Sequence, residues 1–225
     1  MKRFWKDVSV EAGAVLLDGR AIRTPARAPL VLPSHALADA LADEWRAVGA
    51  EVDPRAMPLT GLANAAIDKV GPDVASFAAG LASYGETDLL CYRAEMPPAL
   101  AAWQAQVWDP LLDWAQARYD IAFVVTAGIV HRAQPPATLI RLSSEIAARS
   151  RFELAALLPI VTIGGSLVVA LMLAEHAIGS DAAFDATHLD ELWQADLWGE
   201  EWMAADARAL RRADFASANR MLRLL

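Results

Sequence analysis

The apolar positions follow two different patterns along the chain, and the change comes early. At the start, short apolar runs are separated by turn residues, and residues 15–17 and 21–23 flank the dipeptide Asp18-Gly19. Asp-Gly favours the positive φ angles of a tight turn, so this stretch predicts a β-hairpin. Short strands are also expected on either side of the hairpin, which gives a small sheet.

After Ser34 the apolar residues recur every three or four positions, which is the period of an α-helix. Ser34 itself is a helix-capping residue, and Leu37 and Leu41 follow it on one helical face. A longer apolar face lies in residues 97–119, where Pro110 is expected to bend or split the helix. Most of the chain beyond its first part is therefore predicted to be helical.

Further helices are predicted at 138–149, 152–163, 166–178 and from 185 onward. The β-branched run at 121–126 is instead predicted to be a strand. These assignments give an α+β fold class, with a small N-terminal β-rich domain at 1–56 and a larger C-terminal α-helical domain at 57–225.

One uncharged stretch, residues 154–174, is long enough to be considered as a membrane span. Pro159 and the pair Gly164-Gly165 divide it into pieces of the length found in core helices. We therefore expect two buried helices that meet at a glycine turn, and no membrane insertion. A membrane-embedded segment is the alternative.

Composition narrows the classes of partner. The 225 residues are 56% apolar and carry a formal net charge of −8, with a pI near 5.0. This charge repels phosphate backbones and anionic lipid surfaces, so we expect no nucleic-acid partner and favour a basic or polar-rimmed protein. The single cysteine, Cys91, allows no internal disulfide, and the first residues do not resemble a secretory signal. The single cysteine favours a reducing, intracellular compartment.

The sequence lacks the common catalytic motifs. The sequence contains no glycine-rich dinucleotide or phosphate loop, no zinc-protease motif and no hydrolase nucleophile elbow, so we expect no catalytic residues, metal site or cofactor. The alternative is a small-molecule enzyme whose pocket contains Glu86, Asp88 and Arg93. Cys91 is expected to be a buried, unreactive thiol.

The late part of the chain combines tryptophan with charge. Trp193 and Leu197 fall on one helical face with acidic residues around them, and five arginines follow within residues 208–223. By pattern alone this is an amphipathic helical hairpin with exposed charges. Trp198, which adjoins Gly199 at a helix end, also fits a protein-binding anchor.

A family resemblance is carried by six runs in order: FWKDV from Phe4, LDGRAIRTPARAPLVLPS from Leu17, MPLTGLANAAID from Met57, ETDLLCYRAE from Glu86, WDPLL from Trp108 and DELWQADLWGEE from Asp190. Together they resemble the assembly chaperones of the F-type ATP synthase that act on its alpha subunit. That family has an N-terminal β-rich domain, a C-terminal helical domain and no known catalysis, which agrees with the residue patterns above.

The resemblance implies a chaperone, not an enzyme, that binds the unassembled alpha subunit of the catalytic sector and shields its subunit interface until the beta subunit replaces it. It implies a bacterial, cytoplasmic protein whose eukaryotic relatives act in the mitochondrial matrix. It also places the partner-binding residues in the last run, at Glu191, Gln194, Trp198, Gly199 and Glu200. The functionally sensitive acid would be Glu191 or Glu200.

Overall fold

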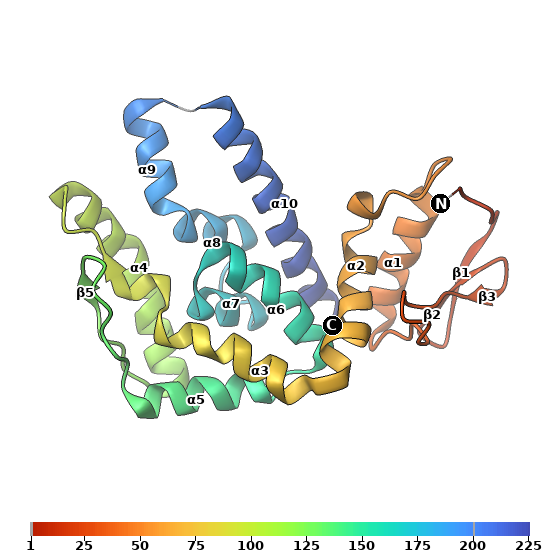
Figure 1. Ribbon diagram of the computed structural model, residues 1–225, viewed down its shortest axis with the longest axis horizontal. Coiled ribbons are helices and arrows are strands. Elements are labelled where there is room, and N and C mark those ends of the chain that lie inside the picture. Colours follow the sequence, from red (N-terminus) through yellow and green to blue (C-terminus); the bar gives the residue numbers. More distant parts are fainter. Residues whose placement is uncertain (1, 200) are drawn as a thin grey trace.

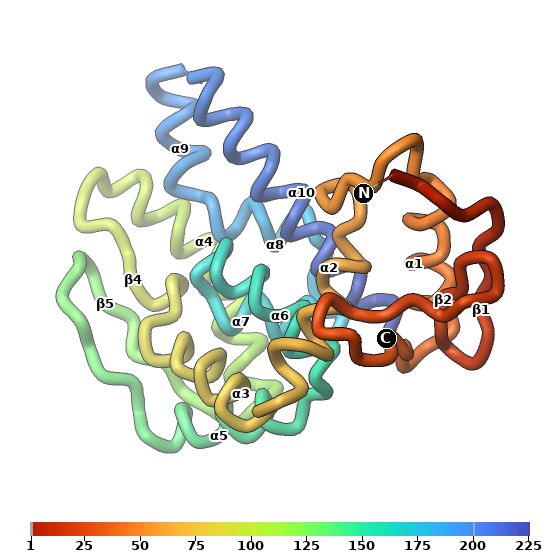
Figure 2. Tube along the Cα trace, turned by 45° about the vertical axis from the view of Figure 1, so that its right-hand side comes forward, coloured from red at the N-terminus to blue at the C-terminus, as the bar shows by residue number. Residues whose placement is uncertain are grey.

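The computed structural model describes residues 2–199 and 201–225. Its long axis runs from a small N-terminal sheet at one end to a larger set of helices at the other (Figure 1). The last two helices project from the helical part as a hairpin, which Figure 2 shows from a second direction. The α+β class predicted from the sequence is confirmed.

The strands are β1 (Val8–Glu11), β2 (Ala14–Leu17), β3 (Arg20–Ala21), β4 (Tyr92–Arg93) and β5 (Thr126–Ala127). The α-helices are α1 (His35–Ala47), α2 (Pro58–Ala65), α3 (Val74–Ala82), α4 (Pro98–Tyr119), α5 (Pro136–Ala147), α6 (Arg151–Gly164), α7 (Leu167–Ala174), α8 (Ser180–Thr187), α9 (Leu189–Trp198) and α10 (Trp202–Leu224). Short 3₁₀ or π turns are found at Pro54–Ala56, Ala66–Val70, Gly71–Asp73, Ser83–Glu86 and Leu89–Cys91.

Strands β1, β2 and β3 form an antiparallel sheet in that order. The predicted hairpin is confirmed between β2 and β3, where Asp18 and Gly19 have left-handed φ angles of 49° and 77°. The Asp18 carboxylate accepts hydrogen bonds from the N–H groups of Asp7 and Lys6 at 2.9 and 3.0 Å, and these bonds lower its pKa. The turn is thereby tied to the segment that leads into β1.

A carboxylate on α1 joins the two sides of the predicted domain boundary. Glu44 accepts hydrogen bonds from the N–H groups of Leu59 and Thr60, at 2.8 Å each, and so caps the first turn of α2. This contact anchors α2 to the N-terminal part of the chain. The division into domains at 1–56 and 57–225 stays a prediction.

Helices α6 and α7 lie at the centre of the helical part, with α2, α3, α4, α8 and α10 packed around them (Figure 1). Every residue in 167–173 is buried. The two central helices meet at Gly165, whose left-handed φ of 69° confirms the predicted glycine turn. Within the described parts of the chain, no helix has both the length and the apolar character needed to cross a bilayer.

Two prolines lie inside helices, although Pro110 was expected to bend or split its helix and Pro159 to divide the apolar run 154–174. Pro110 does not split α4, and Pro159 does not divide α6. Buried side chains continue next to both positions, with Trp108 and Leu112 around the first and Leu157 beside the second. This packing outweighs the backbone hydrogen bond that each proline removes.

The predicted strand at 121–126 is wrong for most of its length, because only its last residue, Thr126, pairs with another strand. A side chain takes the place of a partner strand. The Gln134 amide bonds both backbone groups of Val124, accepting from its N–H at 2.9 Å and donating to its carbonyl oxygen at 3.0 Å. These bonds close residues 124–134 into a loop, called the β5 loop below.

Candidate partner-binding site

The hairpin of α9 and α10 has a base that is fixed in the helical core. Trp108 of α4 donates from Nε1 to the carbonyl oxygen of Ala186 at 2.7 Å. The His188 ring stacks on Phe184 with ring centroids 3.8 Å apart. Burial lowers the pKa of His188, so the ring is neutral near pH 7. The His188 ring therefore contributes aromatic packing, and no charge of its own, at the start of α9.

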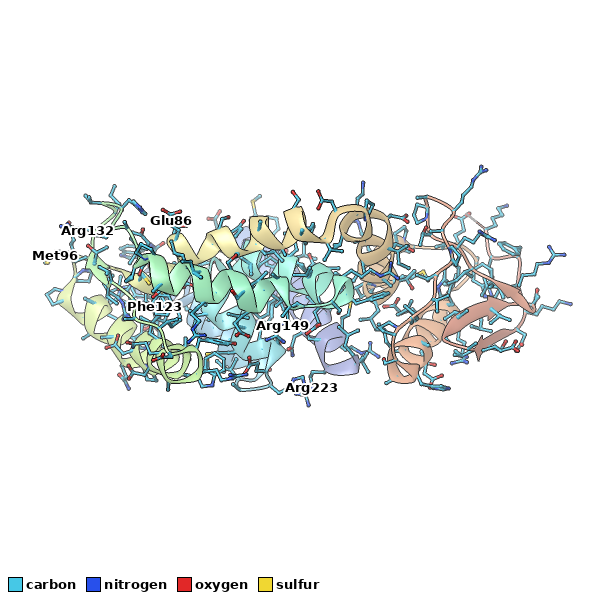
Figure 3. All side chains as sticks on the ribbon, turned by 90° about the horizontal axis from the view of Figure 1, so that it is seen from below. Glu86, Met96, Phe123, Arg132, Arg149 and Arg223 are labelled. Carbon is cyan, nitrogen blue, oxygen red and sulfur yellow. The ribbon has the colours of Figure 1, made fainter. Side chains whose placement is uncertain are left out.

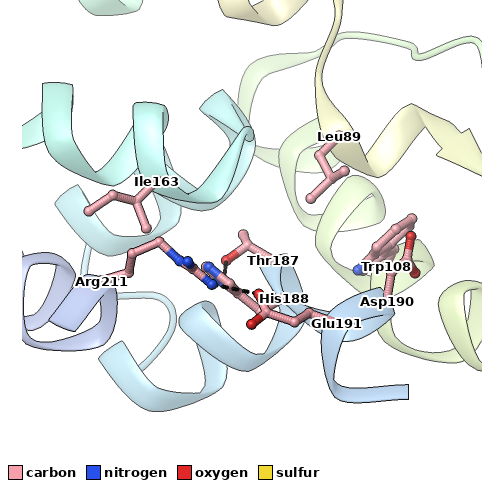
Figure 4. Close-up of a pocket in the computed structure, with 8 residues that line it drawn as sticks. All are labelled: Leu89, Trp108, Ile163, Thr187, His188, Asp190, Glu191 and Arg211. Carbon is pink, nitrogen blue, oxygen red and sulfur yellow. Dashed lines mark hydrogen bonds and ion pairs between the residues drawn. The ribbon is translucent and has the colours of Figure 1, made fainter. Parts of the chain in front are cut away.

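A pocket of about 440 Å³ lies beside this base, and Figure 4 shows the residues that line it. Both carboxylates in the lining already have partners within the protein. Glu191 accepts from Arg211 at 2.6 Å, and Asp190 accepts from the Gln104 amide at 2.7 Å. These contacts hold both carboxylates in place. The residues that line the pocket therefore stabilise the hairpin, and neither carboxylate is positioned as a general acid or base.

Glu191 joins α9 to α10. Its two carboxylate oxygens lie 3.2 Å from a guanidinium nitrogen of Arg208 and 2.6 Å from one of Arg211, and the Arg208 side chain is largely buried. A carboxylate held between two guanidinium groups on successive turns of one helix fixes the distance between the two helices. We call Glu191, Arg208 and Arg211 the hairpin clamp. Arg212 makes a similar connection nearer the base, to two aspartates of α8.

Reversing the charge of Glu191 should open the hairpin clamp. Glu191→Lys places a third cation beside Arg208 and Arg211, and we expect it to lower the free energy of unfolding by about 1–2 kcal/mol, a value reduced for the partial exposure of the carboxylate. Glu191→Gln adds no charge and should lose less. Denaturant unfolding followed by circular dichroism measures both changes. Equal stability of both variants and the wild type would contradict the clamp.

The tip of the hairpin exposes large apolar side chains. Trp198 is 78% exposed and Trp202 is 72% exposed. Leu197 and Met203 are exposed beside them. Gly199 follows α9 with a φ of 86°, which side chains rarely adopt. We call Leu197, Trp198, Trp202 and Met203 the tip patch, and such a patch on an ordered hairpin is typical of a protein-binding surface.

The structure separates the predicted partner-binding residues into two groups. Trp198 and Gly199 lie at the tip, and Gln194 is exposed one helical turn before Trp198. Glu191 lies further down, in the clamp. Glu200 lies outside the described residues. The predicted group thus includes one residue that positions the hairpin and three that lie on or near its exposed end.

The predicted set omitted Trp202 and Met203, which complete the tip patch. A signal for them is present in the sequence, because two large apolar residues follow Glu201 directly, at a helix start where polar residues are usual. The partners of Glu191 had no such local signal, since Arg208 and Arg211 are 17 and 20 residues away along the chain.

Glu86, Asp88 and Arg93 do not converge on one pocket. Asp88 is fully buried, and its carboxylate accepts from the N–H groups of Leu90 and Val168 at 3.0 Å each. Burial raises the pKa of Asp88 to about 6. Glu86 lies at the surface, as Figure 3 shows, while Arg93 lines a separate groove. Asp88 therefore fixes the backbone through these two hydrogen bonds. The geometry does not support the alternative of a small-molecule enzyme with these three side chains in its pocket.

Cys91 is buried, and burial raises the pKa of its thiol to about 12. The thiol is therefore protonated and shielded, as expected, and cannot act as a nucleophile in this state. In residues 2–199 and 201–225, no group of three or more His, Cys, Asp or Glu side chains is placed to hold a metal ion.

Comparison with known proteins decides the family. The family model described as ATP12 chaperone protein matches residues 2–116. The chain belongs to the ATP12 chaperone family. Among ATP12 proteins of known structure, Atp12 from Paracoccus denitrificans is 43% identical, with a TM-score of 0.94 over 99% of this chain and 97% of that one.

Two further relatives extend the ATP12 comparison. The Atu1473 protein of Agrobacterium tumefaciens is 41% identical, with a TM-score of 0.94 over 99% of this chain and 85% of that one. The mitochondrial Atp12 protein of Schizosaccharomyces pombe is 27% identical over 216 residues, which cover 88% of this chain and 74% of that protein. The ATP synthase assembly chaperone family predicted from the six sequence runs is confirmed.

Proposed function

We propose that this chain binds the unassembled alpha subunit of the F-type ATP synthase catalytic sector and shields its subunit interface until the beta subunit replaces it. The observation that carries the proposal is the tip patch, in which two exposed tryptophans stand on a hairpin held by the clamp. Membership of the ATP12 family supports the ATP synthase as the assembly concerned. An unassembled subunit exposes apolar surface that aggregates unless it is covered.

Binding and release follow from mass action. The chaperone lowers the concentration of free, aggregation-prone alpha subunit by occupying its interface. The beta subunit then removes the chaperone by binding an overlapping surface more tightly, so the chaperone must have the lower affinity of the two. Release by this competition needs no nucleotide hydrolysis.

The residues have different parts in this proposal. Trp198 is the anchor, Gln194 is a polar contact beside it, and Gly199 allows the turn that exposes the tip. Glu191 is a positioning residue, because its carboxylate holds α9 to α10. Glu200 is proposed as an acidic contact on the family resemblance alone.

The compartment is also a proposal. Similarity to proteins of Paracoccus denitrificans and Agrobacterium tumefaciens supports a bacterial, cytoplasmic chaperone. The Schizosaccharomyces pombe relative is named as mitochondrial, which supports a matrix location for eukaryotic members.

Co-expression of this chain with the alpha subunit from the same organism tests the binding step. We expect a soluble complex of the two proteins in size-exclusion chromatography, and aggregated alpha subunit when the chaperone is left out. Alpha subunit that aggregates equally in both cultures, with the chaperone eluting alone, would contradict the proposal.

A further inference from the structure

The tip patch takes side chains from both helices of the hairpin, Leu197 and Trp198 from α9 and Trp202 and Met203 from α10. Its shape therefore depends on how α9 lies against α10. Helix α9 has ten residues, a length that is stable only with tertiary contacts. Figures 1 and 2 show α9 between α4 and α10, and the hairpin clamp holds it from the α10 side. Contacts with α4 must fix its other side.

A buried glutamine of α4 makes such a contact. Gln104 is 1% exposed, and its amide nitrogen donates to the carboxylate of Asp190 at 2.7 Å. Its amide oxygen accepts from the N–H of Ala94, also at 2.7 Å. Because a backbone N–H can only donate, the oxygen must face Ala94 and the nitrogen must face Asp190. Asp190 belongs to the first turn of α9, so Gln104 connects that turn to the segment after β4.

The Ala94 end of this connection is itself anchored. The preceding residue, Arg93, lies in β4, and its carbonyl oxygen accepts from the N–H of Gly128 in the β5 loop at 2.9 Å. Its guanidinium pairs with Asp109 of α4 at 2.8 Å. Gln104 therefore ties α9 to a fixed part of the structure.

An aromatic contact lies one helical turn along α9 from this hydrogen bond. The rings of Trp103 and Trp193 have centroids 5.7 Å apart. Apolar contact keeps α9 near α4, but it is not directional and allows the helix to slide or rotate. A hydrogen bond from a buried amide to a carboxylate is directional and charge-assisted. The bond between Gln104 and Asp190 is therefore the contact that fixes the orientation of α9 on α4.

We propose that Gln104 is a positioning residue for client binding, which acts through Asp190 to hold α9 where Trp198 completes the tip patch. This role rests on the proposed function, because the client is the unassembled alpha subunit. Without the hydrogen bond, α9 also occupies positions in which the two halves of the tip patch lie apart. Only the fraction of molecules with a complete patch binds the client, so the apparent Kd rises as that fraction falls.

Two substitutions at Asp190 separate the hydrogen bond from the charge. Asp190→Ala removes the acceptor, whereas Asp190→Asn is the matched control that removes the charge and keeps an acceptor oxygen. We expect about tenfold weaker capture of co-expressed alpha subunit, per folded chaperone, for Asp190→Ala and a change of about twofold or less for Asp190→Asn. Unchanged capture by Asp190→Ala would overturn the positioning role. Equal losses in both variants would also overturn it, by making the charge of Asp190 a direct client contact.

Exchanging the two functional groups tests Gln104 itself. Gln104→Glu alone sets two carboxylates against each other and should weaken capture at least as much as Asp190→Ala. In Gln104→Glu/Asp190→Asn, one oxygen of the new carboxylate accepts from the N–H of Ala94 and the other accepts from the amide now at position 190. The connection is then restored with its donor and acceptor reversed. We expect capture within about threefold of the wild type. A double variant as weak as Gln104→Glu would contradict the positioning role.

Spin labels measure the orientation of α9 without the client. Ala117→Cys on α4 and Asp196→Cys on α9 introduce exposed thiols, and the native thiol of Cys91 is buried. Double electron–electron resonance should give a narrow distance distribution in the wild type and in the exchanged pair, and a broader one in Gln104→Glu. If Gln104 contributes stability alone, the melting temperature of Gln104→Glu falls while the distribution stays narrow, and the positioning role is overturned.

The outcomes distinguish this role from the proposed function. If the wild type captures alpha subunit and the variants capture it equally well, the positioning role is overturned and the proposed function stands. If the wild type captures none, both are overturned.

Discussion

Replacing Trp198 and Trp202 together by alanine should lower capture of the alpha subunit by about a hundredfold, since exposed tryptophans at the centre of an interface are typical hot spots. Both indoles project from the protein, so their truncation removes little internal packing and the fold should be retained. Quantified pull-down of co-expressed alpha subunit measures the loss, and circular dichroism checks the fold.

Phe4→Ala provides the aromatic control for this variant. Phe4 is also exposed, but it belongs to the N-terminal segment at the other end of the molecule. We expect this variant to capture alpha subunit as the wild type does. Undiminished capture by the double tryptophan variant would rule out the tip patch as the main contact. An equal loss in Phe4→Ala would move the contact to the N-terminal end.

Asp88→Ala should lower the free energy of unfolding by about 2–4 kcal/mol, because it leaves two buried N–H groups without an acceptor. These groups belong to Leu90 and Val168, so the carboxylate connects the turn before β4 to the start of α7. Denaturant unfolding measures the loss. Capture of alpha subunit per folded molecule should be unchanged, because Asp88 is buried and is not part of the tip patch. A stability equal to that of the wild type would contradict this structural role.

The loss in Asp88→Ala should also depend on pH. Burial raises the pKa of Asp88 to about 6 in the folded state, from a value of 3.8 without that environment. Between pH 3.8 and about 6, the folded chain keeps a proton on Asp88 that the unfolded chain has released. The stabilisation from this proton is complete below pH 3.8 and is lost as the pH rises through 6. The stability difference between wild type and variant should therefore be larger at pH 4 than at pH 7. A stability difference that grows with pH would contradict the raised pKa of Asp88.

Local geometry explains which parts of the fold were predictable. The Asp18-Gly19 turn and the Gly165 turn depend on backbone conformations that few residues adopt, and Ser34 caps α1 by accepting from the N–H of Leu37 at 3.1 Å. The run at 121–126 was mispredicted because β-branched residues favour extended backbone, whereas strand pairing needs a partner that only tertiary structure supplies.

The candidate site was predictable only where its residues are neighbours in sequence. Trp198 beside Gly199 is a local pattern, and it led to the exposed end of the hairpin. The clamp on Glu191 depends on arginines from another helix. This arrangement does not follow from spacing along the chain.

Displacement by the beta subunit is the most direct test of the holding mechanism. The purified complex of this chain with the alpha subunit is mixed with beta subunit, without nucleotide, and separated by size-exclusion chromatography. The account predicts that the chaperone elutes alone while alpha and beta subunits elute together. A stable complex of all three proteins, or a chaperone that stays on alpha subunit at saturating beta subunit, would contradict it.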